Sequence, residues 1–425
     1  MSSSASYVAD ATDGAGRVMS DEVTPKDTSQ PRRGRRRRRR SPNPKRAVVR
    51  VIVASLASLG LLTGVGVALL YDHWNGNLNF REVDKQVKNR PEKVVQGPLN
   101  ILVMGSDTRD CDGCKVDGEA GGGLSDTTIL IHLSADRDLA YGISVPRDTL
   151  VDRPDCYEED GTTVIPGEQD AQWNEAYKVG GPACTITQLE QLSGIRVDKY
   201  VVVNFAGFKG MVDALGGVEV CIPEDIEDEE HGITLKAGTR ELDGDESLAY
   251  VRVRHNVADG SDTQRIKRQQ EFMAAMIGKV LSTGSLARPD QLIGFMNAAS
   301  DSITTDFRNI ARIARIAKSF TGIGLDDIAF VTTPWEESTT DPGRIVWTPR
   351  VRALWRLVIN DKPLSAAFLE GSITAGSTGE DPAGGSGGDA DESDPADPSS
   401  TSTETGGGAD TPGLSEDERE RAGLC

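Results

Sequence analysis

The sequence predicts an α/β fold in which a mixed central β-sheet is covered by helices on both faces (three-layer αβα), with one N-terminal transmembrane helix. Short apolar runs that stop at glycine or polar residues alternate with stretches of helical period between about residues 98 and 360. Strands that alternate with helices favour a parallel or mixed sheet with helices on both sides. A long uncharged stretch precedes these elements, and both ends of the chain contain few apolar residues.

The transmembrane helix is predicted from residues 51–71, which contain no charged side chain. A helix of this length, at about 1.5 Å per residue, is enough to cross a hydrocarbon core about 30 Å thick. Arginines and lysines from Arg32 to Arg50 precede it, and Asp72 and His73 follow it. The positive-inside rule therefore predicts a single-pass protein of the cell membrane with a cytoplasmic N-terminus and an extracytoplasmic body. A cleaved signal peptide is the alternative, but no small-x-small cleavage site clearly follows the segment.

Composition distinguishes the two ends of the chain from its body. The first residues are rich in Ser, Thr, Pro and Arg and the last in Gly, Ser, Thr, Asp and Glu, so neither end buries enough apolar surface to offset chain entropy. We assign the run RRGRRRRRR to topology and anionic headgroups, and not to nucleic acid. The predicted regions are a disordered basic cytoplasmic segment (1–46), the transmembrane helix (47–71), a juxtamembrane linker (72–97), a central domain (98–282), its C-terminal helical and strand extension (283–370) and a disordered acidic tail (371–425).

The body contains alternating predicted elements. Apolar runs predict strands at 99–105, 126–133, 139–145, 200–204, 218–222 and 328–332. Helical period predicts helices at about 185–192, 205–215, 262–281, 310–320 and 350–359. The short connection SADRD suits a hairpin between the second and third strands, so the second strand is expected to run antiparallel to its neighbours.

Charged residues stand at the ends of the first three strands. Asp107 and Arg109 follow the first strand, Arg147 follows the third, and Asp126 begins the second. Because the second strand is expected to be antiparallel, Asp126 should lie beside Asp107 and Arg147 at one edge of the sheet. Ligands bind at the carboxyl ends of strands in such sheets. The sequence therefore predicts a site there.

A second group of charges lies between residues 250 and 270. Arg252, Arg254, Arg265 and Arg268 fall within seventeen residues of a chain whose formal net charge is −19 at pH 7. Guanidinium forks bind phosphate bidentately, which suits them better than lysine for this ligand. Together with the strand-end residues, these arginines predict a site for a phosphorylated, metal-bound ligand.

The metal predicted for this site is Mg²⁺ (or Mn²⁺). Asp107 and Asp126 supply two carboxylates, and Mg²⁺ takes one or two carboxylates together with phosphate oxygens and water. Asp148 and Asp262 have an alternative role as partners of neighbouring arginines, and Asp262 is also placed to cap a helix. The sequence does not decide which carboxylate acts as a base. The four histidines are scattered, and we expect each to be structural or solvated.

Cysteine placement agrees with an extracytoplasmic body, where disulfides form. Cys111, Cys114, Cys156, Cys184 and Cys221 all follow the apolar segment. We hypothesise a Cys156–Cys184 bridge and a Cys111–Cys114 loop closure, which leaves Cys221 as a buried thiol in a strand. Zinc is the weaker alternative for the CDGC pair, because no second CxxC or histidine pair completes a site.

Seven segments in order carry a family resemblance. They are NILVMGSDTR, SDTTILIHL, ISVPRDTLV, NEAYKVGGPACTITQLEQLSGI, YVVVNFAGFKGMVDALGGVEV, LDGDESLAYVRVR and DTQRIKRQQEF. In order and spacing over about residues 98–280 they resemble the LytR-CpsA-Psr family of cell-wall enzymes, and GGPAC and VEVCIPE resemble its high-GC Gram-positive (actinobacterial) branch. The chain departs from the common pattern because a low-complexity tail stands where other members have a folded C-terminal domain.

The resemblance implies a phosphotransferase that moves an anionic glycopolymer from a polyprenyl-pyrophosphate carrier onto peptidoglycan, with 98–282 as its catalytic domain. It implies that some apolar helix residues line a groove for the polyprenyl chain, although their periodicity fits a core equally well. The implied catalytic residues are Arg147, Arg252, Arg254, Asp262 and Arg265. The implied pyrophosphate-binding residues are Arg109, Arg147, Arg252, Arg254, Arg265, Arg268 and Gln269. A hydrolase that uses the same site, and a non-enzymatic membrane-anchored protein that binds wall polymer or regulatory partners, remain as alternatives.

Overall fold

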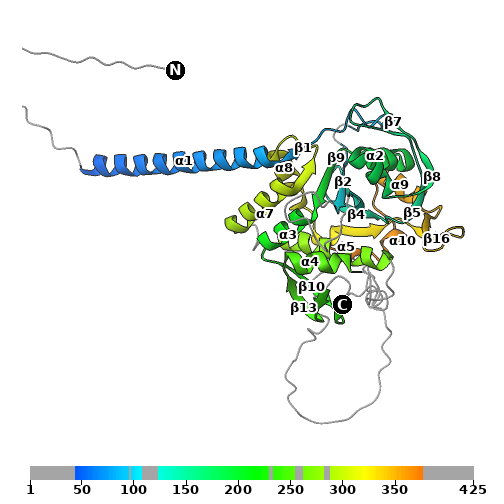
Figure 1. The fold of residues 1–425 in the computed structure, drawn as a ribbon. Helices are drawn as coiled ribbons and strands as arrows, with labels where there is room; N and C mark the ends of the chain where they lie inside the picture. The colour runs from blue at the N-terminus through cyan, green and yellow to red at the C-terminus, as the bar shows by residue number, and fades with distance from the viewer. Residues whose placement is uncertain are drawn as a thin grey trace, which may run out of the picture. The chain divides into compact units, whose positions relative to one another are not determined.

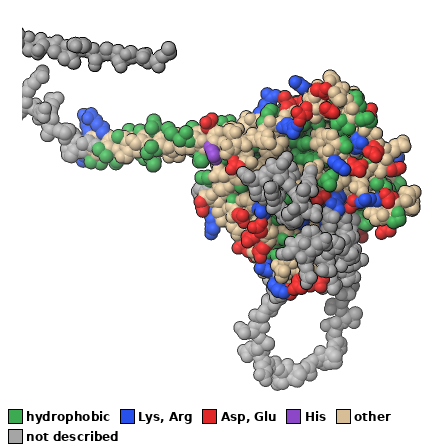
Figure 2. Space-filling view, in the orientation of Figure 1, with side chains coloured by type: hydrophobic (Ala, Val, Ile, Leu, Met, Phe, Trp, Pro, Cys, Tyr) green, Lys and Arg blue, Asp and Glu red, His purple; other side chains and the backbone are tan. Residues whose placement is uncertain are grey.

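A computed structural model describes residues 44–94, 97–107, 123–228, 233–253, 262–281 and 288–376. The chain divides into two compact units, Met1–Thr63 and Gly64–Cys425. Helix α1 (Pro44–Asn77) contains the apolar segment, and within the described residues it is the one helix with the length and composition to cross a membrane, over Val48–Asn77. Figure 2 shows hydrophobic side chains along α1 and basic ones at its N-terminal end. The predicted N-terminal apolar helix is confirmed.

An eight-stranded mixed sheet lies at the centre of the second unit (Figure 1). Its order is β1-β14-β9-β2-β3-β4-β15-β18. The strands are β1 (Asn79–Phe80), β2 (Leu99–Ser106), β3 (Ser125–Leu133), β4 (Ala140–Val145), β9 (Lys199–Asn204), β14 (Ile303–Thr305), β15 (Ile328–Thr332) and β18 (Ile373–Thr374). Strand β2 pairs in parallel with β9, and β4 with β15, whereas β3 is antiparallel to both β2 and β4. The hairpin predicted between the second and third strands is confirmed.

Helices cover both faces of this sheet. On one face, α2 (Glu175–Ser193) and α9 (Val351–Ile359) pack Leu189 and Trp355 against residues of the central strands. On the other face, Ala274 of α5 (Asp262–Leu281) packs in a cluster with Leu133 and Phe330. Beside α5 lie α3 (Phe205–Ala214) and α4 (Gly244–Arg252). The three-layer αβα prediction is therefore confirmed.

The remaining elements surround this core. The helices are α7 (Pro289–Ser302), α8 (Ile310–Phe320), α10 (Ala366–Leu369) and the 3-10 turn η1 (Leu325–Asp327). A four-stranded sheet has the order β16-β17-β5-β8, formed by β16 (Trp335–Glu337), β17 (Ile345–Trp347), β5 (Thr149–Arg153) and β8 (Glu168–Gln172). Three ribbons pair β10 (Val218–Ile222) with β13 (Gly238–Leu242), β11 (Ile226–Asp228) with β12 (Ile233–Leu235), and β6 (Cys156–Tyr157) with β7 (Val164–Ile165). The strand predicted at 218–222 exists, but it belongs to a ribbon and not to the central sheet.

Two predicted boundaries fall inside the folded body. Leu78, Val83 and Val87 are buried, so much of the predicted linker 72–97 belongs to the core. Ile373 and Ala375 are each 2% exposed and pack against the sheet, although both lie in the predicted tail 371–425. Single apolar residues spaced among polar ones have no periodicity, which is why composition placed these segments outside the core.

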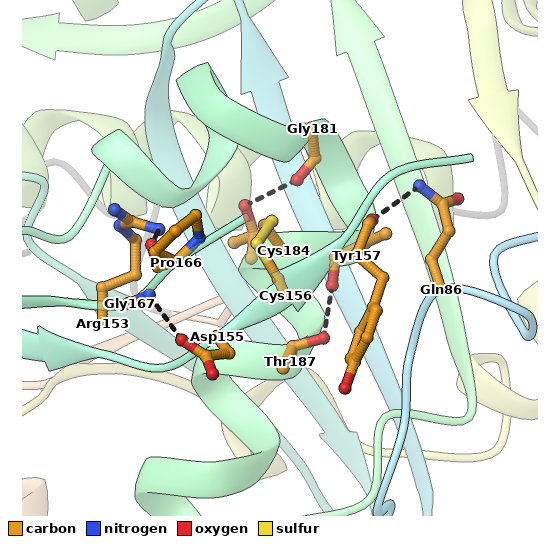
Figure 3. The surroundings of a disulfide bond; sticks show 12 residues. Gln86, Arg153, Asp155, Cys156, Tyr157, Pro166, Gly167, Gly181, Cys184 and Thr187 are labelled. Atoms are coloured by element: carbon orange, nitrogen blue, oxygen red, sulfur yellow. Dashed lines mark hydrogen bonds between the residues drawn. A yellow bond between two sulfur atoms is a disulfide. The ribbon is translucent and has the colours of Figure 1, made fainter. Parts of the chain in front are cut away.

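One predicted disulfide is present. Cys156 of β6 is bonded to Cys184 of α2, with a Cα–Cα distance of 5.3 Å, as Figure 3 shows. The bridge lies among hydrogen bonds that hold the β6 segment, including one from Gln86 Nε2 to the carbonyl oxygen of Tyr157 (3.3 Å). The prediction for Cys221 is wrong. This residue is half-buried and disulfide-bonded, and its partner lies outside the described residues, as do Cys111 and Cys114. Val220 and Ile222 on either side of it are buried, and side chains alternate between the two faces of a strand, so Cys221 faces away from the core.

Candidate functional site

A β-bulge places Asp126 at the strand-end edge of the central sheet, where β3 begins and where β2 and β4 end. Gly105 pairs with Thr127 and Ser106 pairs with Ser125, so Asp126 is the extra residue between the two pairs. A bulge redirects a side chain out of the regular alternation of its strand. From this position, Asp126 Oδ1 accepts a hydrogen bond from Arg147 Nη1, at 2.6 Å. The carboxylate and the guanidinium expected to meet at this edge therefore do so.

Asp107 lies at the same edge, one residue beyond the end of β2. Its Oδ1 accepts hydrogen bonds from the backbone amides of Gly123 (2.9 Å) and Leu124 (2.8 Å). These bonds fix the chain as it enters β3. One carboxylate oxygen of Asp107 is therefore occupied by two backbone hydrogen bonds, close to the bulge that carries Asp126.

Asp148 connects two arginines. It lies 3.4 Å from Arg147 Nε through its Oδ2, and its Oδ1 accepts a hydrogen bond from Arg344 Nη1. Its carbonyl oxygen also accepts a hydrogen bond from the backbone amide of Ile345, at the start of β17 (3.4 Å). This arrangement supports the alternative role of Asp148 as a partner that orients arginines. Sequence analysis did not identify Arg344, because it is an isolated residue that only the sheet pairing brings to Asp148.

A cavity of about 420 Å³ opens between the sheet and helices α3, α4 and α5. Its polar lining residues are Asp126, Thr127, Asn204, Arg252, Arg265 and Gln269. Its other lining residues are apolar or glycine: Val103, Met104, Gly105, Ile129, Val203, Phe205, Phe208, Met211, Ile233, Leu248, Val251, Val253, Phe272, Met273 and Met276.

The lining changes character along its elements. On α5 it changes from Arg265 and Gln269 to Phe272, Met273 and Met276, over about 16 Å at 1.5 Å per residue. On β3 it likewise changes from Asp126 and Thr127 to the apolar Ile129. The cavity therefore joins a charged region at the strand ends to an apolar region deeper between helix and sheet.

Arg252 enters the cavity from the last residue of α4. Its guanidinium lies over the ring of Phe205, 4.7 Å from the ring centroid. Helix α4 begins with a capping box, in which Asp243 accepts from the Glu246 amide and Glu246 accepts from the Asp243 amide. Sequence analysis did not predict α4, although the Asp-x-x-Glu pattern was a usable signal. It also missed Asn204, which lines the cavity and accepts the Gly207 amide as the N-cap of α3.

Arg265 and Arg268 are both buried, at 2% and 1% exposed, but they face different surroundings. Arg265 lines the cavity, whereas Arg268 donates to the carbonyl oxygen of Val253 (2.6 Å) behind it. Gln269 lines the cavity and donates to the carbonyl oxygen of Val251 (3.2 Å). Arg268 thus ties α5 to the end of α4.

Three expected site residues have side chains outside the described part of the chain. Arg109 and Arg254 are not described, and for Asp262 only the backbone is described, as the first residue of α5. Within the described residues, no group of three or more His, Cys, Asp or Glu side chains is placed to hold a metal ion. A metal at this edge would therefore depend on Asp107 and Asp126.

One other titratable group lies near the site. Burial raises the pKa of Tyr177, which hydrogen-bonds to Ser106 at the end of β2 and lies close enough to Asp107 for that carboxylate to raise it further. Its phenol is therefore protonated at neutral pH. Tyr177 is therefore a hydrogen-bonding group beside the end of β2.

Known proteins share this chain's pattern. The LytR_cpsA_psr family matches residues 74–357. Cell wall biosynthesis protein LcpA of Corynebacterium glutamicum is 30% identical over 328 residues, covering 71% of this chain and 62% of LcpA. TagU of Enterococcus faecalis, named a polyisoprenyl-teichoic acid–peptidoglycan teichoic acid transferase, is 30% identical over 256 residues, covering 60% of this chain and 77% of TagU.

Solved structures share the fold. Protein gbs0355 of Streptococcus agalactiae has a TM-score of 0.51 at 22% identity, covering 63% of this chain and 90% of that one. The matched region spans less than two thirds of LcpA and about half (52%) of LcpB, another C. glutamicum relative. Since the family match extends over most of the described body, the chain belongs to the LytR_cpsA_psr family.

Proposed function

We propose that this protein is a phosphotransferase that moves an anionic cell-wall glycopolymer from a polyprenyl-pyrophosphate carrier onto peptidoglycan. The observation that carries this proposal is the cavity whose lining changes from Asp126, Arg252 and Arg265 to apolar residues. A lipid pyrophosphate has the same two parts, a diphosphate and a hydrocarbon chain. Relatives named as teichoic acid–peptidoglycan transferases support the reaction class.

The arginines have the role of binding the diphosphate. Opposite charges 4 Å apart attract by about 4 kcal/mol at an effective dielectric near 20. Arg252 and Arg265 line the cavity, and Arg147 is held at its edge by Asp126. We assign Arg109 and Arg254 to the same anion from the sequence alone. Arg268 supports the site through its bond to Val253.

The apolar region has the role of holding the first part of the polyprenyl chain. Phe272, Met273 and Met276 of α5 line this region together with Phe208 and Met211 of α3, and the Phe208 and Phe272 ring centroids lie 5.3 Å apart. Burying apolar surface contributes about 25 cal/mol per Å². Methionines adapt their shape readily, which suits a flexible hydrocarbon chain. The diphosphate is thereby fixed near the strand ends.

The transfer breaks the phosphoanhydride bond of the carrier and forms a phosphodiester bond to the acceptor. The acceptor hydroxyl oxygen attacks the phosphorus that carries the glycopolymer, and the bond from that phosphorus to the bridging oxygen breaks. Polyprenyl phosphate leaves with the bridging oxygen, and the hydroxyl proton passes to a base. Arg147, Arg252 and Arg265 stabilise the negative charge that develops on the phosphates.

Asp107 and Asp126 fit the needs of Mg²⁺ (or Mn²⁺). Both are oxygen donors at one sheet edge, and two carboxylates are the number that Mg²⁺ accepts when phosphate oxygens and water complete its shell. A bound Mg²⁺ would supply charge neutralisation for the leaving phosphate. Arg147 sets the orientation of Asp126 in that site through their 2.6 Å bond.

The decisive experiment incubates the full-length protein with lipid-linked glycopolymer and peptidoglycan, with and without Mg²⁺. Polymer covalently attached to peptidoglycan is the expected product, and a chelator should abolish it. Free polymer phosphate without attachment would instead identify a hydrolase. Unchanged substrate that remains bound would identify a binding protein. Either result would overturn the proposed transfer.

A further inference from the structure

Helix α8 carries a row of exposed cations. Arg312, Arg315 and Lys318 are exposed, whereas Ile313 and Ile316 of the same helix are half-buried. The three cations are three residues apart, so successive side chains lie about 60° apart around the axis and occupy an arc of about 120°. The exposed residues between them, such as Ala314, are small. A flat surface can therefore approach all three charges together.

These three cations form no ion pair within the described part of the chain. No carboxylate there pairs with Arg312, Arg315 or Lys318, whereas Arg308, just before the helix, pairs with Glu82 at 2.9 Å. The protein has a formal net charge of −19, and acids outnumber bases in it by 66 to 47. On a protein this acidic, three neighbouring exposed cations that pair with no described carboxylate indicate an anionic partner.

The position of α8 beside the end of α1 indicates which anionic partner it meets. The backbone amide of Ile310, its first residue, donates to Asn75 Oδ1 of α1 at 2.9 Å. Two further bonds join the end of α1 to α7, from Trp74 Nε1 to Asn297 Oδ1 (2.6 Å) and from Asn77 Nδ2 to Asp301 Oδ1 (2.7 Å). Figure 1 shows α8 at this end of α1.

The length of α1 beyond its apolar segment indicates how far from the hydrocarbon core the contact between α1 and α8 lies. Asn75 is four residues beyond Tyr71, the last residue of the uncharged segment, which corresponds to about 6 Å along a helix. When the apolar segment crosses the bilayer, the start of α8 therefore lies at the level of the headgroups.

We propose that α8 binds anionic phospholipid headgroups through Arg312, Arg315 and Lys318. The ligand is the headgroup phosphate in the leaflet on the side of the body. Each cation near an anionic bilayer surface strengthens binding by about fivefold. The attraction decays over a Debye length of about 10 Å at 0.1 M salt, so it acts only on a helix kept at the surface. Together with the anchor, α8 gives the body a second attachment point and one orientation at the bilayer.

The test uses full-length protein in two kinds of nanodisc. One contains phosphatidylcholine alone and is neutral, and the other also contains about 30% phosphatidylglycerol and is anionic. Hydrogen–deuterium exchange of residues 310–320 is measured in each. We expect protection at least tenfold greater in the anionic discs, and loss of that difference in 0.5 M NaCl. The variant R312Q/R315Q/K318Q removes the charges and keeps good helix formers, so it should exchange at the same rate in both discs.

A matched variant controls for total charge. R352Q/R356Q/K362Q removes three exposed cations in and just after α9, and it should retain the lipid-dependent protection at α8. Equal protection of wild-type α8 in both discs would overturn the proposal. So would protection in neutral discs that appears only when anionic wall polymer is added, because the cations would then bind polymer and not lipid. Unchanged protection in R312Q/R315Q/K318Q would exclude these side chains as its cause.

Discussion

At the scale of single residues, the pairing of Arg147 with Asp126 joins the ends of β4 and β3. Asp148 holds the same arginine from the other side, and Arg344 holds Asp148. The guanidinium therefore has a fixed position before any ligand arrives. A group placed in advance stabilises developing charge without a cost of reorganisation.

Replacement of Arg147 tests this position. Arg147→Ala should lower turnover about tenfold to a hundredfold, since a charge-assisted hydrogen bond contributes about 1.5–3 kcal/mol. Arg147→Lys should also be impaired, because a point charge does not reproduce the planar fork. Turnover and melting temperature are measured for both variants, with Arg308→Ala, which removes an exposed cation paired with Glu82 away from the cavity, as the control. A lower melting temperature with normal turnover would mean that Arg147 is only a structural ion-pair partner.

His132 lies within the central sheet at 1% exposure. Its Nδ1 contacts Asn100 Oδ1 at 2.8 Å and its Nε2 contacts Asp361 Oδ1 at 3.1 Å. Burial lowers the pKa of His132, although Asp361 partly opposes this shift. The native state therefore binds a proton less readily than the unfolded state, whose histidine has a pKa near 6.5.

The lowered pKa of His132 predicts the direction in which the stability of the fold changes with pH. Above about pH 6.5 both states hold neutral His132, and the fold keeps its full stability. As the pH falls through about 6.5 the unfolded state gains the proton first, so the melting temperature should fall from that pH downward. His132→Gln should flatten that dependence, whereas His73→Gln, at an exposed position, should not. Equal slopes in wild type and His132→Gln would show that another group causes the effect.

At the scale of elements, the Cys156–Cys184 bridge fixes the β6 ribbon to α2. The helix is interrupted at Gly180 and Gly181, just before Cys184. A Cβ on Gly180 would lie 2.1 Å from the sulfur of Cys184, so only glycine leaves room for the bridge there. Glycine at the kink therefore leaves the space that the disulfide occupies.

Removal of this bridge should destabilise the body. The bonded residues are 28 apart in sequence, and the chain-entropy estimate for a loop of this size is roughly 3.5 kcal/mol. The double variant C156S/C184S should show a correspondingly lower midpoint in denaturant, and a steeper slope because its unfolded state is less compact. Peptide mapping of the unreduced wild type checks the pairing, and a peptide that links Cys156 to any cysteine other than Cys184 would contradict it.

The elements also show what sequence patterns reveal. Strands β2, β3, β4, β9 and β15 were predicted within one or two residues, because their apolar runs end at glycine or polar residues. The bulge at Asp126 was not predicted, since a one-residue shift between β2 and β3 leaves no trace in composition. Helix α4 was missed because its apolar residues, Leu248 to Val251, are consecutive and give no helical period. The edge at which the site forms was thus predictable, but the direction of the Asp126 side chain was not.

At the scale of the whole molecule, segments far apart in sequence complete the same sheet. Strand β14 pairs with β9, and β15 pairs with β4. The region after residue 282, predicted as an extension, therefore supplies strands to the central sheet itself. Tertiary pairing of this kind is decided by packing between distant segments, which short-range periodicity does not record.

The C-terminal boundary can be located by truncation. Strand β18 pairs with β15 through Phe330↔Ile373, and the Ala375 amide donates to the Ile328 carbonyl oxygen at 3.0 Å. A chain that ends after Gly376 retains these contacts and should melt like the full-length protein. A chain that ends after Glu370 loses them together with the buried Ile373 side chain.

Loss of one buried aliphatic side chain alone costs about 2–5 kcal/mol, and the exposed edge of β15 adds to that loss. We therefore expect the chain ending after Glu370 to melt well below the chain ending after Gly376, both measured in the same detergent with helix α1 present. Because β15 pairs with β4, which leads into Arg147, the shorter chain should also lose transfer activity. Identical melting of the two truncated chains would show that β18 contributes nothing to the fold. A lower melting temperature for the chain ending after Gly376 than for the full-length protein would show that residues beyond 376 belong to the folded body.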